Sequence, residues 1–362
     1  MKRLILGILV ILLIGSLAIV GCQGEESTPA PTSTPTSAPA PTPAEQIVLS
    51  YNKMGPTVQR ASQEPAEYFA AEVEKRTEGR VKIELYPNSA LANPQQTYEA
   101  VLNGVSDIGE SQAAYTAGRF PATQISEIPL GYNNSWVGSH AMTDWMEHFK
   151  PTEWDTTVTM YMFVTTPYLI GTVNKPVRKV EDLKGMIIRS SGIASDEYVK
   201  ALGATPRAFP VTEVYEALSK AMIDGMLMPF EAYPAFKFYE VVKYATDTSF
   251  SSYAGASYVV MNKASYSKLS PQDQQILLEV GYDTMDLRGR IFVEESTNAQ
   301  ELFLSQPGRE LITLAPEEVA KVQAAANTVI DGWIKEKTAD GFPAQEYVDY
   351  MRERVEYWST QQ

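Results

Sequence analysis

Arg189 is the side chain whose type and position point most directly to chemistry. It ends a short apolar run, Met186–Ser190, that follows the Lys184-Gly185 turn and is typical of a strand. In open α/β sheets ligands bind beyond the carboxyl ends of strands, and a guanidinium matches a carboxylate with two parallel hydrogen bonds. Arg189 is therefore a candidate anion-binding residue. Chemistry alone leaves one alternative open, a surface arginine paired with a nearby acid.

The only two histidines of the chain, His140 and His148, lie with Asp144 at positions i, i+8 and i+4 of an expected helix. Such a face could chelate a metal ion. Only neighbouring pairs can share one ion easily, however, and no further motif supports a metal site. We interpret the segment as an amphipathic surface helix, and we expect neither a metal nor another cofactor.

No sequence pattern predicts catalysis. The chain has no G-x-S-x-G elbow, Walker loop, G-x-G-x-x-G turn, zincin helix or EF-hand loop. Two histidines on one helix argue against a Ser-His-Asp triad, and acidic pairs such as Glu294-Glu295 are most simply solvated helix faces. We expect that the protein is not an enzyme. A lipoprotein hydrolase, which would turn over its bound ligand, is the competing class.

Arg189 belongs to a stretch, Asp182–Pro229, whose pattern predicts strand, helix, strand, helix, strand. The expected strands are Met186–Ser190, Thr205–Pro210 and Met226–Phe230, and the expected helices are Ile193–Leu202 and a second helix from Thr212 through Met222. This alternation is typical of a mostly parallel sheet with helical crossovers.

An earlier stretch predicts the same order. Its strands are expected at Ile47–Tyr51, Val81–Leu85 and Val105–Gly109, with helices at Pro65–Thr77 and Pro94–Leu102. Tyr98–Asp107 also aligns without a gap with Tyr215–Asp224, sharing Tyr-Glu-Ala and a final aspartate. A chance echo is the alternative to two related lobes whose strands end at a common cleft.

The remaining elements connect or cover these two units. Strands are expected at Thr172–Val177, between the lobes, and at Tyr258–Met261, crossing back. A long helix is expected from Pro271 to about Leu304, unless Gly281 or Gly289 bends it, and two further helices at Pro316–Lys337 and Ala344–Trp358.

The N-terminal segment predicts export and a tether. Lys2 and Arg3 precede an apolar run from Leu4 to Val20, as in a secretory signal peptide covering residues 1–21. Cys22, the only cysteine, follows a sequence that resembles a lipobox and would become a lipidated N-terminus; an uncleaved membrane anchor is the alternative. Residues 22–45 are rich in Pro, Thr, Ser and Ala and predict a disordered spacer.

The charge of the chain limits its partners. The net charge is −14, and removal of the signal, which carries Lys2 and Arg3 and no acid, leaves −16. An acidic body argues against binding nucleic acid or anionic lipid. Only a local positive group such as Arg189 could then hold an anionic ligand.

Several motifs resemble those of the solute-binding proteins of tripartite ATP-independent periplasmic (TRAP) transporters, the DctP-like family. They are DLKGMIIRSSG, LGATP and TEVYEALSKAMIDG around Arg189, together with YPNSAL near residue 86 and EAVLNGVSDIG near residue 100. The resemblance implies a two-lobed α/β fold like that of type II periplasmic binding proteins, with a ligand cleft between the lobes and a long helix spanning both. It also implies that Arg189 grips the carboxylate of the ligand.

The positions around the expected cleft depart from two known ligand patterns of that family. Leu169 stands where sialic-acid binders carry a second arginine, and Leu227 and Met228 stand where metal-bridged oxo-acid binders carry an acid and a tryptophan. We therefore expect an organic monocarboxylate with an apolar or aromatic body. The expected pocket residues beside Arg189 are Tyr51, Gln112, Tyr115, Leu169, Pro210, Val211, Met228 and Phe230.

Together these observations predict an extracytoplasmic, lipid-anchored solute-binding protein that closes its lobes around a small organic acid and delivers it to TRAP membrane subunits. The expected lobes are residues 46–166 with about 255–294, and residues 167–254 with about 295–362. A membrane-tethered sensor of the same fold, not coupled to transport, is the alternative.

Overall fold

The structure, a computed structural model, describes residues 46–251 and 253–362. All of them belong to one compact unit, residues 44–362. The predicted signal peptide, the lipidation site Cys22 and the spacer 22–45 lie outside the described residues. Among the residues described, no helix is both long enough and apolar enough to cross a bilayer.

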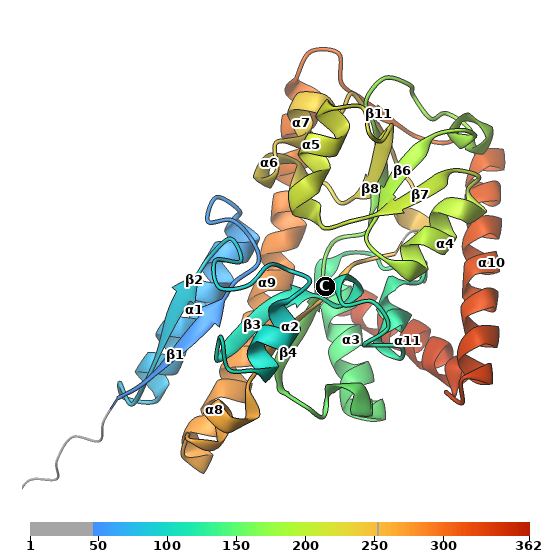
Figure 1. Cartoon of the computed structure of the whole chain (residues 1–362). Coiled ribbons are helices and arrows are strands. Elements are labelled where there is room, and N and C mark those ends of the chain that lie inside the picture. Colours follow the sequence, from blue (N-terminus) through green and yellow to red (C-terminus); the bar gives the residue numbers. More distant parts are fainter. Residues whose placement is uncertain (1–45, 252) are drawn as a thin grey trace, which may run out of the picture. The chain divides into compact units, whose positions relative to one another are not determined.

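A five-stranded sheet occupies the lower part of the molecule in Figure 1, in the order β2-β1-β3-β10-β4. Its strands are β1 (Ile47–Asn52), β2 (Val81–Tyr86), β3 (Ile108–Gln112), β4 (Val158–Val164) and β10 (Ala256–Met261). β1 pairs in parallel with β2 and β3, whereas β10 runs antiparallel to β3 and β4. The helices that connect its parallel strands are α1 (Arg60–Arg76) and α2 (Thr97–Leu102).

A six-stranded sheet forms the upper part, in the order β11-β9-β5-β8-β6-β7. Its strands are β5 (Leu169–Thr172), β6 (Ile187–Ser190), β7 (Thr205–Ala208), β8 (Gly225–Met228), β9 (Tyr244–Thr246) and β11 (Glu310–Ile312). β6 is parallel to both β7 and β8, while β5 is antiparallel to β8 and β9. Its helices are α4 (Ile193–Ala201), α5 (Val214–Ser219), α6 (Ala232–Ala235) and α7 (Phe238–Val241).

The two sheets contain the same unit, as the sequence echo predicted. The order β2-β1-β3 in one sheet corresponds to β7-β6-β8 in the other. The aligned aspartates make the same bond: Asp107 Oδ2 accepts from the backbone N–H of Ser50 at 2.8 Å, and Asp224 Oδ2 accepts from that of Ile187 at 2.7 Å. Each aspartate thus ties the start of the third strand of its unit to the first.

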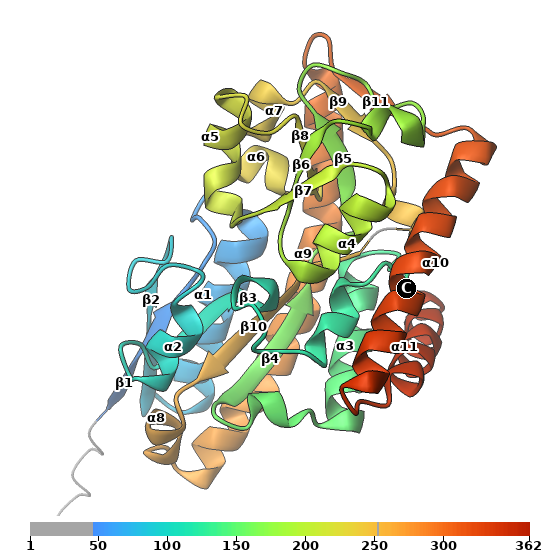
Figure 2. The same ribbon diagram turned by 45° about the vertical axis from the view of Figure 1, so that its right-hand side comes forward.

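Helix α9 (Pro271–Ser305) runs along both sheets, in line with the prediction of a long helix (Figures 1 and 2). Ser270 caps it, accepting from the N–H of Asp273. It does not break at Gly281 or Gly289. These glycines instead permit close packing, since a Cβ at Gly281 would lie 2.5 Å from the carbonyl oxygen of Met160.

The remaining helices are α3 (Ser135–Phe149), α8 (Lys263–Ser267), α10 (Pro316–Ala339) and α11 (Ala344–Ser359). α3 packs on β4 of the five-stranded sheet and is covered by α11, whereas α10 contacts both α11 and α4 of the six-stranded sheet (Figure 2). Because α11 covers α3, the interpretation of α3 as a surface helix is wrong at His140, which is 3% exposed and stacks on Trp358. No group of three metal-binding side chains occurs in the described ranges.

Several element boundaries differ from the predictions. The strand expected at Val105–Gly109 is β3, Ile108–Gln112, and the helix expected at Pro94–Leu102 begins at Thr97. α1 begins at Arg60, not at Pro65, because the carboxylate of Glu295 on α9 accepts from the backbone N–H groups of Arg60 and Ala61 at 2.9 and 3.0 Å. The strand expected at Thr172–Val177 is wrong, since β5 ends at Thr172. α5 ends at Ser219, three residues before Met222.

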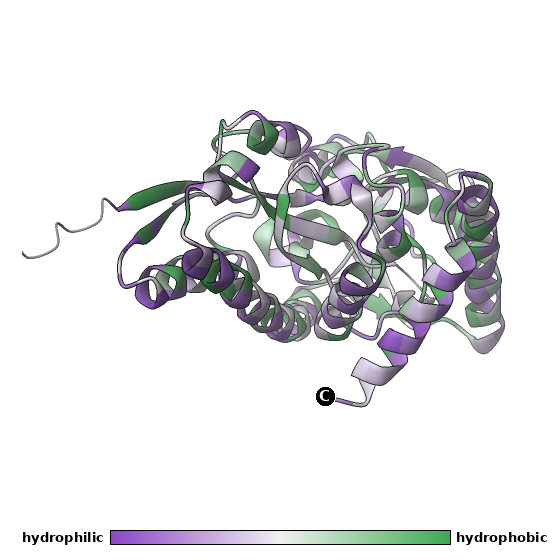
Figure 3. Ribbon diagram, turned by 90° about the horizontal axis from the view of Figure 1, so that it is seen from below, coloured by the Kyte–Doolittle hydropathy of each residue, from purple (hydrophilic) through white to green (hydrophobic). Residues whose placement is uncertain are grey.

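The core lies between each sheet and its covering helices. Seen from below, the strands are largely hydrophobic while the outer helices carry hydrophilic and hydrophobic faces (Figure 3). The cores of the five-stranded sheet include Tyr98, Trp145 and Phe69, all fully buried. The space between the two sheets is bordered by strand ends and by polar side chains.

Candidate functional site

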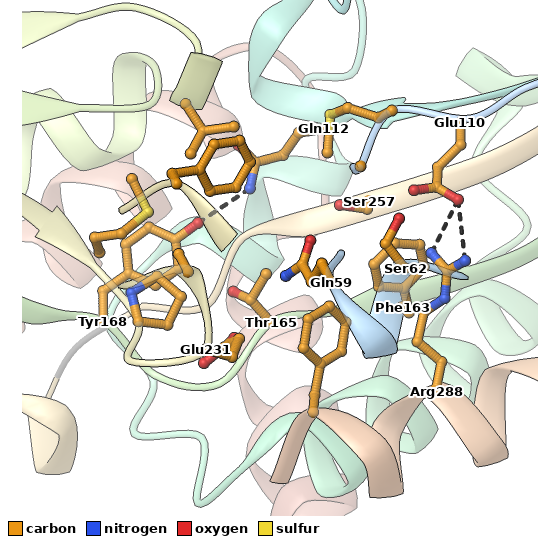
Figure 4. A pocket seen from close by; sticks show the side chains of 18 of the residues that line it. Gln59, Ser62, Glu110, Gln112, Phe163, Thr165, Tyr168, Glu231, Ser257 and Arg288 are labelled. Atoms are coloured by element: carbon orange, nitrogen blue, oxygen red, sulfur yellow. Dashed lines mark hydrogen bonds and ion pairs between the residues drawn. The ribbon is translucent and has the colours of Figure 1, made fainter. Parts of the chain in front are cut away.

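A cavity lies between the two sheets and encloses about 590 Å³ of empty space, including its opening to solvent. One wall comes from the five-stranded sheet and α9, the other from the six-stranded sheet and the loop after β8. Figure 4 shows side chains from both walls directed into this space. A cavity lined by apolar side chains and a few convergent polar groups is a candidate site for a small organic molecule.

Arg189 lines this cavity from β6, between β8 and β7 of the six-stranded sheet, and is fully buried. Its Nε and Nη2 donate to the carbonyl oxygen of Phe209 at 3.0 and 2.8 Å, and Nη1 lies 3.5 Å from that of Leu227. Within the described residues all its hydrogen-bond partners are neutral oxygens. The alternative of a surface arginine paired with an acid is therefore wrong.

Tyr115 reaches Arg189 from the other wall. It ends the short 3₁₀ turn Ala113–Tyr115 that follows β3. Its hydroxyl accepts from Arg189 Nη2 at 3.3 Å and from the backbone N–H of Val211 at 3.1 Å. The hydrogen of this hydroxyl has no acceptor among the described residues, so it is available to an anion beside the guanidinium.

A second hydrogen bond joins the two walls beside the bond between Tyr115 and Arg189. Gln112, at the end of β3, donates through Nε2 to the hydroxyl of Tyr168 at 3.1 Å (Figure 4). Tyr168 precedes β5 and is buried. Because both pairs connect residues of different sheets, they require the lobes to be closed.

Another part of the cavity holds a buried ion pair. Arg288 of α9 donates to Glu110 of β3, with Nη1 and Nη2 each 3.0 Å from Oε2, and the two residues are 1% and 2% exposed. The guanidinium also lies over the ring of Phe163, 4.1 Å from its centroid. Removing one partner would leave an uncompensated buried charge.

Lys53 adds a second cation behind this pair. Its Nζ donates to the carbonyl oxygen of Gly55 and the hydroxyl of Ser62, both at 2.9 Å. Burial lowers the pKa of Lys53 to about 8, although the Glu110 carboxylate acts in the opposite direction. This amine is therefore still largely charged at neutral pH.

Glu231 is the other acid that lines the cavity. Its Oε1 accepts from the backbone N–H of Thr166 at 3.0 Å, and its Oε2 from the hydroxyl of the same residue. Burial raises the pKa of Glu231 to about 7, against the effect of these two hydrogen bonds. A large fraction of Glu231 is thus neutral near pH 7, which limits its repulsion of an anion.

Of the nine residues predicted for the pocket, five line this cavity: Gln112, Tyr115, Arg189, Val211 and Met228. Leu169 and Phe230 line a separate hollow near Pro167. Tyr51 lies behind Glu110, to which its hydroxyl donates at 2.7 Å, and Pro210 is buried next to Val211, outside the cavity lining.

Sequence reasoning missed Glu110, Tyr168, Glu231 and Arg288, together with Phe163 and Phe292. Glu110 had a signal, since it lies two residues before Gln112 and a strand places i and i+2 on one face. Arg288 had none, because the pattern of α9 does not tell which of its polar residues faces the other elements.

The chain matches known proteins over most of its length. Residues 57–337 match the model of the bacterial extracellular solute-binding proteins, family 7 (DctP). A solute-binding protein of Albidiferax ferrireducens is 28% identical over 221 residues, 59% of this chain and 64% of that relative. The chain thus spans just under two thirds of this relative's length.

Two solved structures share the fold. One is a TRAP solute-binding protein from an unidentified marine microbe, specific for aromatic acid ligands and bound to metahydroxyphenylacetate; it is 27% identical, with a TM-score of 0.81 over 86% of this chain and 99% of that one. The other, from Rhodoferax ferrireducens T118 with copurified benzoate, is 25% identical, with a TM-score of 0.82 over 87% and 99%. These matches confirm the predicted two-lobed fold.

Proposed function

Because the chain belongs to family 7 of the bacterial extracellular solute-binding proteins, the DctP family of TRAP solute-binding proteins, we propose that it captures an organic monocarboxylate at Arg189. The ligand would have an apolar or aromatic body, as the aromatic acids named for the two structural neighbours do. Delivery to TRAP membrane subunits, and not signalling, is part of this proposal.

The observation that carries the proposal is the environment of Arg189. A fully buried guanidinium whose hydrogen-bond partners in the described chain are all neutral retains a positive charge that no acid compensates. This charge faces a cavity. A carboxylate ligand would supply the missing counter-charge, and each charged hydrogen bond would contribute about 1.5–3 kcal/mol.

Arg189 and Tyr115 would hold the carboxylate together. Phe209 engages Nε and one hydrogen of Nη2. The outer hydrogens of Nη1 and Nη2 make only long contacts, 3.5 Å to the carbonyl of Leu227 and 3.3 Å to the hydroxyl of Tyr115, which a carboxylate would replace as it binds this outer fork. The hydroxyl hydrogen of Tyr115 would donate to the same carboxylate. Three donors from two walls would fix both the position and the plane of the anion.

The rest of the cavity favours an apolar body. Its apolar lining residues are Phe163, Phe292, Val211, Met228 and Phe236, beside the neutral polar side chains of Gln59, Ser62, Thr165 and Ser257. Burying apolar surface against such walls yields about 25 cal/mol per Å². Aromatic rings add a preference for a flat ligand that can stack on them or meet them edge-on.

Lobe closure would couple binding to delivery. The bonds Tyr115–Arg189 and Gln112–Tyr168 connect the two walls, so a ligand that engages both walls binds the closed state more tightly and shifts the population toward it. We keep the expected lobes, residues 46–166 with about 255–294 and residues 167–254 with about 295–362, but assign α11 to the first lobe, because it packs on α3.

We also propose that the mature protein is anchored outside the cytoplasm through a lipid on Cys22. The support is the sequence of residues 1–45 and the family, whose members are extracellular. The spacer would let the binding body reach both free ligand and the membrane subunits.

A thermal-shift screen of aliphatic, aromatic and dicarboxylic acids tests the proposal. A ligand that binds only the folded state adds about 2.7 kcal/mol of stability at 100 times its dissociation constant. We expect aromatic monocarboxylates to raise the melting temperature most, with the matching amides as inactive controls. The proposal is wrong if no acid in the screen shifts the melting temperature or if the amides act equally.

A further inference from the structure

One carboxylate oxygen of Glu110 faces the cavity and has no hydrogen-bond partner among the described residues. Its Oε2 accepts from the hydroxyl of Tyr51 at 2.7 Å and from Arg288 at 3.0 Å. Its Oε1 has no hydrogen-bond partner in the described part of the chain, although the residue is only 2% exposed and lines the cavity. Figure 4 shows this oxygen directed away from Arg288, toward the side of Ser62 and Ser257.

The oxygen lies on the same wall as the residues next to the carboxylate site. Glu110 and Gln112 are two positions apart on β3, so their side chains leave one face of the strand about 6.6 Å apart. Ser257 of β10 pairs with Gln112 and lines the same cavity. A ligand held at Arg189 and Tyr115 therefore extends along a wall that ends in a free acceptor.

The charges around Glu110 select the kind of donor. A ligand ammonium would approach a carboxylate that already serves Arg288, with Lys53 as a second cation nearby. Two fixed positive charges against one negative charge repel a third cation. A neutral hydroxyl meets no such repulsion and still supplies the hydrogen that Oε1 lacks.

The cavity that holds these two polar ends is lined by the apolar side chains of Phe163, Phe292 and Met228, with the neutral polar side chains of Gln59, Thr165 and Ser257 among them (Figure 4). A ring fits this geometry better than a flexible chain, because it bridges the two ends without losing torsional freedom on binding. A phenolic hydroxyl is also neutral at physiological pH, since its ordinary pKa is about 10.

We propose that the ligand of this cavity is a hydroxylated aromatic monocarboxylate, whose carboxylate binds Arg189 and Tyr115 and whose ring hydroxyl donates to Glu110 Oε1. This inference rests on the proposed function and adds the second polar group of the ligand. Glu110, held by Arg288 and Tyr51, then determines specificity for the hydroxyl.

Calorimetry on the wild-type protein tests this proposal with phenylacetate and its 2-, 3- and 4-hydroxy derivatives. At least one hydroxy isomer should bind 10-fold or more tightly than phenylacetate, which corresponds to about 1.4 kcal/mol. The matching methoxy derivative, which cannot donate, should lose this gain, and the aminomethyl derivative should bind more weakly than phenylacetate.

A variant pair assigns the preference to Glu110. Glu110→Gln should reduce the ratio of the affinities for the hydroxy derivative and for phenylacetate to less than 3-fold. This change leaves Arg288 without its counter-charge. A second variant, Glu110→Gln combined with Arg288→Gln, therefore removes both charges together. Glu301→Gln, on the exposed side of α9, is the control.

The outcomes separate the two proposals. If phenylacetate and its hydroxy derivatives bind equally, or if the methoxy derivative matches the hydroxy one, the role of Glu110 is overturned while carboxylate capture stands. If none of these acids binds and no carboxylate shifts the melting temperature, both proposals are overturned.

Discussion

The hydroxyl of Tyr115 lies 3.3 Å from Arg189 Nη2, although Tyr115 follows β3 of one sheet and Arg189 lies in β6 of the other. The same hydroxyl accepts from the backbone N–H of Val211 at 3.1 Å. Both bonds use the oxygen as an acceptor, so the hydroxyl hydrogen remains for a ligand. This contact therefore marks the point where a ligand and lobe closure can be coupled.

Replacing Tyr115 with Phe should weaken carboxylate binding roughly 10- to 100-fold, because a hydrogen bond to a charged group contributes about 1.5–3 kcal/mol. Calorimetry with the best acid from the screen measures the change. Tyr357→Phe, at an exposed tyrosine of α11, is the matched control and should leave affinity unchanged. Equal affinity for Tyr115→Phe and wild type would show that this hydroxyl does not touch the ligand.

Replacing Arg189 with Lys should reduce affinity at least 10-fold even though the charge is kept, since an ammonium lacks the planar fork. Arg189→Gln, which also removes the charge, should abolish measurable binding. Arg309→Lys is a matched control, because Arg309 also donates through Nε and Nη2 to one carbonyl oxygen, that of Tyr239. Wild-type affinity in Arg189→Lys would contradict bidentate binding.

The sequence predicted the fold where local pattern decides it. The strand-helix-strand units, the long helix α9 and the two C-terminal helices follow from periodicity and caps such as Ser270. The start of α1 could not be predicted, because the group that caps it is Glu295, 235 positions away. His140 was misjudged for the same reason, since the helix that buries it comes from the other end of the chain.

The site was predictable only from strand ends and from the family motifs. These place Arg189, Gln112 and Met228 at the cavity. Leu169 and Phe230 lie close in sequence to lining residues yet face another hollow. Successive side chains near a strand end point to opposite faces, so a residue next to a lining residue can face a different surface. The ion pair Glu110–Arg288 joins a strand and a helix 178 positions apart, which no local pattern reveals.

Glu127 should make the protein less stable as the pH rises. Burial raises its pKa to about 8, which a backbone hydrogen bond from Ala114 only partly offsets. Between the ordinary pKa of about 4.5 and about 8, the folded state therefore binds more protons than the unfolded state, and the free energy of unfolding falls with pH. Other acids also titrate in this range, so the effect of Glu127 is measured as the difference in melting temperature between Glu127→Gln and the wild-type protein.

Glu127→Gln should accordingly melt several degrees higher than wild type at pH 8.5 and within about a degree of it at pH 4.5, by order of magnitude. Scanning calorimetry at both values measures this, with the exposed Glu301→Gln as control. A constant difference between Glu127→Gln and wild type across this range would mean that the carboxyl does not titrate between the two values.

The paired turns of the internal repeat allow the last prediction. After α2, Gly104 at φ 71° donates to the carbonyl of Val101, and the next N–H donates to that of Ala100. After α5, Ala221 adopts the same left-handed conformation at φ 53° and makes the corresponding bonds. Such helix-ending turns favour glycine, and a Cβ in this conformation costs about 1 kcal/mol.

Ala221→Gly should therefore stabilise the protein by about 0.5–1 kcal/mol, since relief of strain exceeds the added freedom of the unfolded chain. The reciprocal change Gly104→Ala should destabilise it by a similar amount, because a Cβ there meets no atom within 4 Å and only backbone strain acts. Urea unfolding of both variants measures the two changes. Stabilisation by Gly104→Ala, or destabilisation by Ala221→Gly, would show that the two turns are not equivalent.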